Sequence, residues 1–219
     1  MRKILFIIMA ACSLMMEAVE LNTSNRDTNY VKAIIDRSQK VVDKLDMTDG
    51  EKAQQVRNII ANRYFALNDI YAQRDTTVNR AKASLTGGNK KMAVEAAENQ
   101  KDAQLYKTHF AFVTDLSVYL NELQMEAVKD AMTFGVVKVT YDAQCDMIPT
   151  LKDDEKVQIL AWLKEAREYA IDAESAKKKH ECFGKYKGRI NNYLSKRGYD
   201  LNKEREEWYK RVKARGGKL

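Results

Sequence analysis

The chain has 219 residues, of which 45% are hydrophobic and 32% are charged, and its formal net charge is +7. This length and apolar content are sufficient for one domain with a proper core. A single proline and nine glycines argue against a turn-rich sandwich or barrel, which needs turn residues about every ten positions. We therefore expect an all-α chain, a single-domain bundle of about five to seven helices.

The N-terminal segment MRKILFIIMAACSLMMEAVEL has the order of an export signal. A basic pair precedes an apolar run, residues 4–16, that is too short to span a bilayer. We interpret residues 1–18 as the signal and residues 19–219 as the helical domain. The cleavage type stays open, because Cys12 follows two alanines in a weak lipoprotein box while Ala18 could end an ordinary signal. The predicted location is the periplasm, or the outer membrane for a lipoprotein, with no transmembrane segment in the mature chain.

Positive charge is concentrated at the C-terminal end. Residues 177–219 contain 15 Lys and Arg and 5 Asp and Glu, a net charge of +10, so the preceding residues carry −3. In a cytosolic protein such a basic part would indicate nucleic acid. Because we expect export, we expect no nucleic acid, and an acidic glycan or another acidic envelope component becomes the predicted partner. The alternative, which we favour, is a solvated helix face with interleaved Glu204, Glu206 and Glu207.

Four helices are predicted in the first half of the chain from their apolar periodicity. The first contains an apolar stripe over residues 31–45. The second begins at a capping box formed by Thr48 and Glu51 and continues into the 80s, where the glycine pair of LTGGNKK ends it. A third helix is expected over about residues 91–120, and a short fourth helix follows Asn121, which is a plausible cap.

The segment FGVVKVTYDAQCDMIP contains the only β-prone run of the mature chain. One strand cannot form a sheet, so we expect an extended linker or a short helix there. A helix is expected shortly after Pro149, because the acidic residues 153–155 suit a helix N-terminus. Its apolar stripe runs from Ile159 to Ala173. Another helix follows, and the last helix opens at Asp200.

The segment FGKYKGRINNYLSKRGYDL, residues 183–201, is unusually rich in aromatic, glycine and amide residues. On a helix its aromatic residues share one stripe with Ile190, so most of them are expected in the core. Gly184 and Gly188 lie four residues apart on one side, which predicts the close approach of another backbone.

Packing leaves Arg189, Asn191 and Asn192 unexplained. Planar groups rich in donors, placed beside an aromatic ring, suit a sugar, because rings stack on apolar sugar faces and amides pair with hydroxyl groups. We therefore predict a ligand site in which at least two of these three residues line a pocket together with Tyr199 or Trp162. The alternative is that the amides cap a neighbouring helix or hold a loop in place.

Catalytic constellations are not apparent in the sequence. The chain has two histidines, His109 and His180, and contains no phosphate-binding loop, nucleophile elbow or zinc pattern. We expect His109 in the core with its hydrogen bonds satisfied. Glu165, Glu168 and Asp172 share one helix side, as paired glycosidase acids could, but a solvated face explains them more simply. Enzyme activity stays open but is disfavoured, and we predict no catalytic residue, cofactor or metal.

Two cysteines follow the signal, Cys145 and Cys182. An exported protein lies where disulfides persist, so the two could pair. Alternatively both are free and buried, since cysteine behaves as a small hydrophobic residue. We expect no catalytic role in either case.

Three segments, MTFGVVKVTYDAQCDMIPTL, ILAWLKEAREYAIDAESAKKKH and FGKYKGRINNYLSKRGYDL, resemble the signature stretches of the DUF3826 family, exported proteins of Bacteroidetes and related bacteria with no established activity. The resemblance extends over residues 30–208. It implies a helical exported domain described as sugar-binding, and it supplies no catalytic or binding residues to transfer.

Two further segments, MTDGEK and LNELQMEA, are faintly similar to the LTxxQ pattern of Spy-like periplasmic chaperones. We therefore expect an exported helical accessory protein that binds a glycan. A Spy-like helical chaperone or envelope scaffold is the alternative.

Overall fold

The computed structural model describes residues 18–217 of the chain, and these residues contain eight α-helices and no strand. The predicted all-α class is confirmed for this part of the chain. The expected number of helices is wrong, because the segment left open as a linker or short helix forms a helix of its own. The predicted export signal, apart from residue 18, and the lipoprotein Cys12 lie outside the described residues.

The helices are of very unequal length, and the second and third are much the longest. Their bounds are α1 (Thr28–Val42), α2 (Gly50–Ser84), α3 (Gly87–Ser117), α4 (Glu122–Met132), α5 (Val136–Met147), α6 (Asp153–Ala170), α7 (Ala176–Lys196) and α8 (Leu201–Ala214). In residues 18–217 no helix combines the length and the apolar character that crossing a membrane requires.

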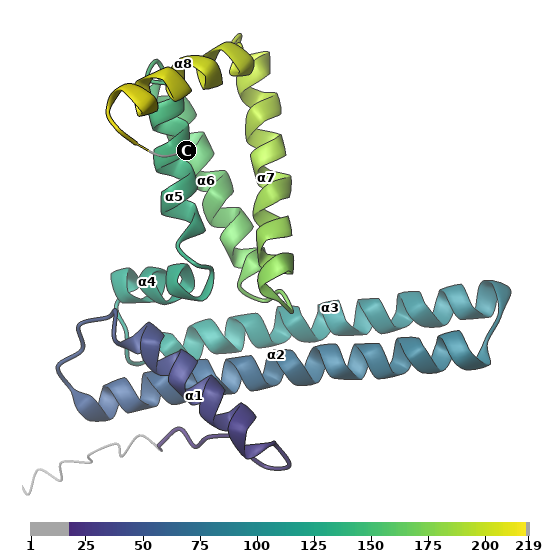
Figure 1. Cartoon of the computed structure of the whole chain (residues 1–219). Helices are drawn as coiled ribbons and strands as arrows, with labels where there is room; N and C mark the ends of the chain where they lie inside the picture. Colours follow the sequence, from purple (N-terminus) through teal and green to yellow (C-terminus); the bar gives the residue numbers. More distant parts are fainter. Residues whose placement is uncertain (1–17, 218–219) are drawn as a thin grey trace, which may run out of the picture.

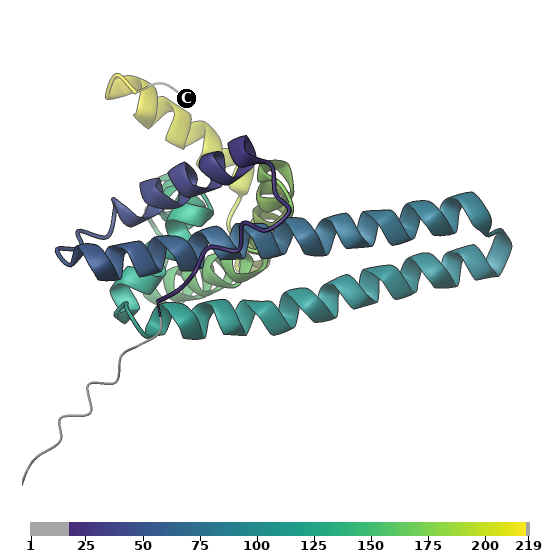
Figure 2. The ribbon, with the colours of Figure 1, turned by 90° about the horizontal axis from the view of Figure 1, so that it is seen from below.

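The molecule has two arms that meet at an angle (Figure 1). α2 and α3 form a long antiparallel hairpin, α1 packs on α2, and α4 lies beside the open end of the hairpin. The second arm consists of α5, α6 and α7, which rise from the side of the hairpin, and α8 crosses their far end. Figure 2 shows that the turn between α2 and α3 extends well beyond the other helices.

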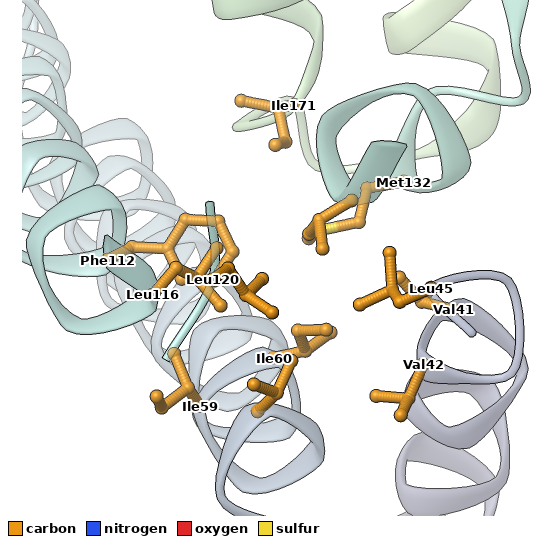
Figure 3. Close-up of a cluster of buried hydrophobic side chains, with 12 residues drawn as sticks. Val41, Val42, Leu45, Ile59, Ile60, Phe112, Leu116, Leu120, Met132 and Ile171 are labelled. Atoms are coloured by element: carbon orange, nitrogen blue, oxygen red, sulfur yellow. The ribbon is translucent and has the colours of Figure 1, made fainter. Parts of the chain in front are cut away.

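The first arm packs around an apolar cluster to which four helices contribute (Figure 3). α1, α2, α3 and α4 all bury residues there, and one residue of the α6–α7 connection joins them. The cluster consists of Val41, Val42, Leu45, Val56, Ile59, Ile60, Phe112, Leu116, Leu120, Val128, Met132 and Ile171. Ile171 therefore anchors the second arm in the core of the first.

The second arm has a separate apolar cluster, built from α5, α6 and α7. It consists of Val136, Val137, Met147, Ile148, Leu151, Ile159, Leu163, Ala166, Ala170, Phe183, Ile190 and Leu194. The predicted stripes of α6 and α7 enter this cluster, except that Tyr169, which was expected in the α6 stripe, is 64% exposed. Trp162, Tyr186 and Tyr193 are half-buried at its edge.

Helix starts follow the capping chemistry, with one correction. Asn121 and Gln124 form a capping box at the start of α4, and Asp200 caps α8 as predicted. The predicted capping box of Thr48 is wrong, because α2 and its cap lie one residue further along the chain. Asp49 is the cap, and its carboxylate accepts from two backbone N–H groups.

The β-prone run Val136–Met147 forms α5. No strand in the described part of the chain could pair with it, so its backbone hydrogen bonds are satisfied within a helix instead. The helix starts after Gly135, whose φ of 67° lies in the left-handed region. Its β-branched side chains Val136 and Val137 are buried in the second cluster.

The predicted close approach at Gly184 and Gly188 is wrong. Both glycines are exposed, and a Cβ built on either would meet no atom within 4 Å. The reason is that Phe183 and Ile190 turn the apolar face of α7 into the second cluster, which leaves the glycines on the solvent face.

Candidate functional site

A cleft of about 780 Å³ lies in the corner between the two arms. Its walls come from α2, α3, the C-terminal end of α6, the α6–α7 connection and the first half of α7. We call it the corner cleft. The connection is fixed to α2 because the Tyr71 hydroxyl donates to the carbonyl oxygen of Asp172 over 2.9 Å.

Three exposed aromatic rings surround the corner cleft. Tyr106 and Phe110 lie one turn apart on α3 and are 70% and 54% exposed, and Tyr169 of α6 is 64% exposed. The rings of Tyr106 and Phe110 meet edge to face, with centroids 4.9 Å apart. Exposed rings that gather at a hollow mark a binding surface better than scattered ones do.

Ion pairs occupy the floor of the cleft. His109 Nδ1 lies 2.9 Å from Asp172 Oδ2, and its Nε2 lies 3.5 Å from Glu168 Oε2. Arg63 Nη2 donates to Asp172 Oδ1 over 2.5 Å, and Lys129 Nζ donates to Glu168 over 2.9 Å. Asp172 is thus held between two cationic groups, and Glu168 contacts three, because Arg167 Nη2 also lies 3.4 Å from its Oε1.

This arrangement keeps the floor charged. The hydrogen bond to Asp172, with a second to Glu168, raises the pKa of His109 to about 9. Burial alone would raise the pKa of Glu168, but the hydrogen bonds from His109 and Lys129 outweigh it and lower the pKa to about 2. At neutral pH His109 is a poor base and Glu168 a poor acid. The floor is therefore better suited to hydrogen bonding than to proton transfer.

Two interpretations of the sequence need correction here. His109 has satisfied hydrogen bonds, as expected, but it lines the cleft instead of lying in the core. Glu168 and Asp172 are not a solvated face, because the two arms enclose them with His109. Of the three acidic residues only Glu165 is exposed.

The sequence analysis did not identify the aromatic rings of the corner cleft as part of a binding site. The signal was present, since Tyr106 and Phe110 lie four residues apart and away from the stripe of Phe112 and Leu116 that enters the core. What could not be read was that α6 would place Tyr169 opposite them.

The residues of the sequence-predicted site lie at different places. The guanidinium carbon of Arg189 lies 4.5 Å from the ring centroid of Trp162, and its Nη1 donates to Glu165 over 3.3 Å. Asn191 lines a separate groove of about 270 Å³ with Trp208. Asn192 is exposed. Of the five residues of this predicted site, the structure brings only Arg189 and Trp162 together.

Tyr199 is engaged at the far end of the second arm. Its hydroxyl donates to Glu155 Oε2 over 2.6 Å and lies 3.2 Å from the carbonyl oxygen of Thr150. Arg197 Nε donates to the other oxygen of Glu155 over 2.8 Å. In this structure Tyr199 therefore ties the turn before α8 to the start of α6.

Cys145 and Cys182 are free thiols, both half-buried, so the disulfide alternative is not formed in this structure. Burial raises the pKa of Cys182, which lines the corner cleft, and so disfavours its thiolate.

Five of the 14 Lys and Arg residues at positions 177–217 are paired with carboxylates. This supports the solvated-face alternative for part of the charge. The pairs are Lys178 with Glu181, Arg189 with Glu165, Arg197 with Asp154 and Glu155, Lys210 with Glu207, and Arg215 with Asp146.

Within residues 18–217 no group of three or more His, Cys, Asp or Glu side chains is arranged to hold a metal ion.

Comparison with known proteins places the chain in a family. No curated protein matches the chain. A family model described as "Protein of unknown function (DUF3826)" matches residues 31–214, which is most of the chain. This match confirms the resemblance of the three signature segments, and the chain belongs to the DUF3826 family.

Proposed function

We propose that the protein binds a glycan in the corner cleft without altering it chemically. The observation that carries this proposal is the gathering of three exposed rings, Tyr106, Phe110 and Tyr169, around a hollow with a charged floor. Sugar rings present apolar C–H faces that stack on aromatic side chains, and their hydroxyl groups pair with charged and amide groups. The volume of about 780 Å³ lies in the usual range for small-ligand sites.

The polar side chains of the cleft support the same ligand class. Lys101, Asp102 and Lys185 line it in addition to the ion-paired floor, so donors and acceptors are both available. Because His109 and Glu168 are held by their partners, a bound sugar would meet groups that are already oriented. Such preorganisation lowers the entropic cost of binding.

A glycan array followed by calorimetry on the best glycan tests the proposal. We expect Tyr106→Ala and Phe110→Ala each to weaken binding roughly tenfold, since each removes a stacking surface. The melting temperature should stay nearly unchanged, because both rings are exposed. Tyr209→Ala is the matched control, since Tyr209 is also an exposed ring but lies on α8. Absence of any bound glycan, or equal losses in Tyr106→Ala and Tyr209→Ala, would contradict the proposal.

A Spy-like chaperone remains the second candidate, because exposed rings in an open cleft also suit unfolded chains. An aggregation-suppression assay with the same variants separates the two. Suppression that is lost in Tyr106→Ala and Phe110→Ala, together with a blank array, would favour the chaperone.

We also propose export to the periplasm or the outer membrane, as the N-terminal segment predicts. Fractionation of cells that produce the full chain tests it. Replacement of Cys12 by Ser distinguishes the lipoprotein from the ordinary signal, because only the lipoprotein route requires that cysteine.

A further inference from the structure

A second groove, of about 630 Å³, lies between α1, α2, the end of α4 and the start of α7. We call it the α1 groove. Figure 2 shows α1 and α3 on opposite sides of α2, so the α1 groove and the corner cleft open on different sides of that helix. Ala173 and Glu174 of the α6–α7 connection line both.

Cations without carboxylate partners line the rim of the α1 groove. Arg37 and Lys40 lie one turn apart on α1, Lys44 follows in the turn after this helix, and all three are exposed. Within residues 18–217 none of them forms an ion pair with a carboxylate. The one carboxylate that lines the groove, Glu174, is held by Arg74 over 2.6 Å. The groove therefore has an uncompensated positive charge.

A buried cation lies at the floor. Lys179 is 6% exposed, and its Nζ donates to the carbonyl oxygens of Met132 over 2.9 Å and Ile171 over 3.4 Å. In the described residues no carboxylate lies within ion-pair distance of it, although buried lysines are seldom without such a partner. An ammonium has three donors. Two are used by the carbonyl oxygens, so one is left for a ligand.

The charged groups around Lys179 do not compensate for its lack of a carboxylate partner. Asp172, whose negative charge acts on Lys179 and raises its pKa, already binds Arg63 and His109. Arg37 and Arg63 add positive charge, and burial, the largest influence, lowers the pKa of Lys179 to about 8. An anion in the groove would relieve this cost.

An aromatic ring joins the rim to the floor. The guanidinium carbon of Arg37 lies 5.4 Å from the centroid of the Tyr64 ring, and Lys179 Nζ lies 5.9 Å from it. Tyr30 and Tyr71 also line the groove. A ligand that carries both an anionic group and a ring or apolar face would match this lining.

We propose that the α1 groove is an anion-binding site for a sugar-sized ligand with a carboxylate or phosphate group, which Lys179 contacts at the floor and Arg37 and Lys40 contact at the rim. A flat anionic surface could reach the rim cations but not Lys179, which is recessed. The proposal is independent of glycan binding in the corner cleft, because it rests on different residues and a different opening.

Calorimetry on the full chain tests the site with glucose 6-phosphate, trigalacturonate and inorganic phosphate, and with glucose and maltotriose as neutral counterparts. We expect the sugar anions to bind and the neutral sugars not to bind at this groove. Lys40→Gln should weaken binding of the anions roughly fivefold to tenfold and Lys179→Met by more than tenfold. Lys32→Gln is the matched control, since Lys32 is an exposed lysine of α1 that does not line the groove.

Several results would overturn the site. These are no binding of any anionic probe, equal losses in Lys40→Gln and Lys32→Gln, or neutral sugars that bind as tightly as the anions and lose affinity in Lys40→Gln. Binding of anionic phospholipid vesicles that Lys179→Met leaves unchanged, with no binding of the soluble anions, would show a membrane-facing rim instead. If Lys179→Met does not fold, Arg37→Gln replaces it, because Arg37 is exposed. Phosphate alone binding as tightly as glucose 6-phosphate would support the site and limit recognition to the anion.

Discussion

His109 connects the chemistry of the corner cleft to the stability of the molecule. Its pKa is raised from 6.5 to about 9, so the folded state favours the charged imidazolium. The resulting stabilisation is fully present below pH 6.5 and is lost as the pH rises through about 9. The contribution of Glu168 to stability depends on pH in the opposite direction. Its pKa is lowered from 4.5 to about 2, so its stabilisation is lost as the pH falls through about 2. Between pH 4.5 and 6.5 both contributions are complete.

We predict that the wild type loses about 2–3 kcal/mol more stability than His109→Gln when the pH is raised from 6 to 9.5. Urea unfolding at both pH values measures this difference. The comparison with the variant is needed because Lys179, whose pKa is lowered by burial, changes in the opposite direction over part of the same range. Equal pH dependence in the two proteins would show that His109 is not charged in the folded state.

For single residues, the sequence indicated the kind of interaction that a side chain makes more reliably than its partner or its place in the structure. The satisfied state of His109 was predictable, but its partner Asp172 lies 63 residues away, and no local pattern shows that pairing. Arg189, one residue of the predicted ligand site, lies over the ring of Trp162. Asn191, two positions further along α7, lines another groove, because residues two apart on a helix face nearly opposite directions.

The solvent face of α7 allows a test at the scale of the element. We predict that Gly184→Ala and Gly188→Ala each stabilise the protein by about 0.5–1 kcal/mol, because alanine loses less backbone entropy in a helix and both sites have open space. Gly135→Ala is the opposite control and should destabilise by about 1 kcal/mol, since its φ of 67° strains any Cβ. The urea concentration at the midpoint of unfolding, measured at neutral pH for each variant, tests this prediction. A destabilising Gly184→Ala would mean that another chain covers this face in solution.

Helix positions were predictable wherever capping and periodicity agreed, as at Asn121 and Asp200. Helix positions were less predictable where the residue composition of a segment favoured one structure and its surroundings in the fold favoured another. The valines after Gly135 favour strands as isolated residues, but with no strand to pair with they form α5. The glycines of α7 were misread for a similar reason, because helical spacing does not reveal which face is covered.

On the scale of the molecule, polar contacts join the two arms. Arg63 of α2 binds Asp172 after α6, and Lys129 of α4 binds Glu168 of α6. Arg167, which is buried, donates to Glu126 and Asp130 of α4. These pairs link residues 37–109 positions apart, so the sequence could indicate each helix but not the angle between the arms. Both grooves lie along this junction, which explains why neither was predicted.

We predict that Arg63→Met makes the two arms unfold separately. The Arg63 side chain is 2% exposed, and its replacement leaves Asp172 with one cationic partner fewer. Breaking a buried ion pair in this way lowers the free energy of unfolding by about 3 kcal/mol. Both tryptophans, Trp162 and Trp208, lie in α6 and α8, so fluorescence reports the second arm while circular dichroism reports all helices.

In the wild type the fluorescence and circular dichroism transitions in urea should coincide, because Arg63, Lys179 and Ile171 connect the second arm to the first. In Arg63→Met their midpoints should differ, since each arm then depends more on its own core. Arg26→Met is the control, because Arg26 pairs with Asp69 inside the first arm and should cost stability without separating the transitions. Coincident transitions in Arg63→Met would mean that the contacts left in place, which are the apolar contact of Ile171 and the polar contacts of Lys129, Arg167 and Lys179, are sufficient to couple the arms. The ion pair of Arg63 would then serve the cleft more than the fold.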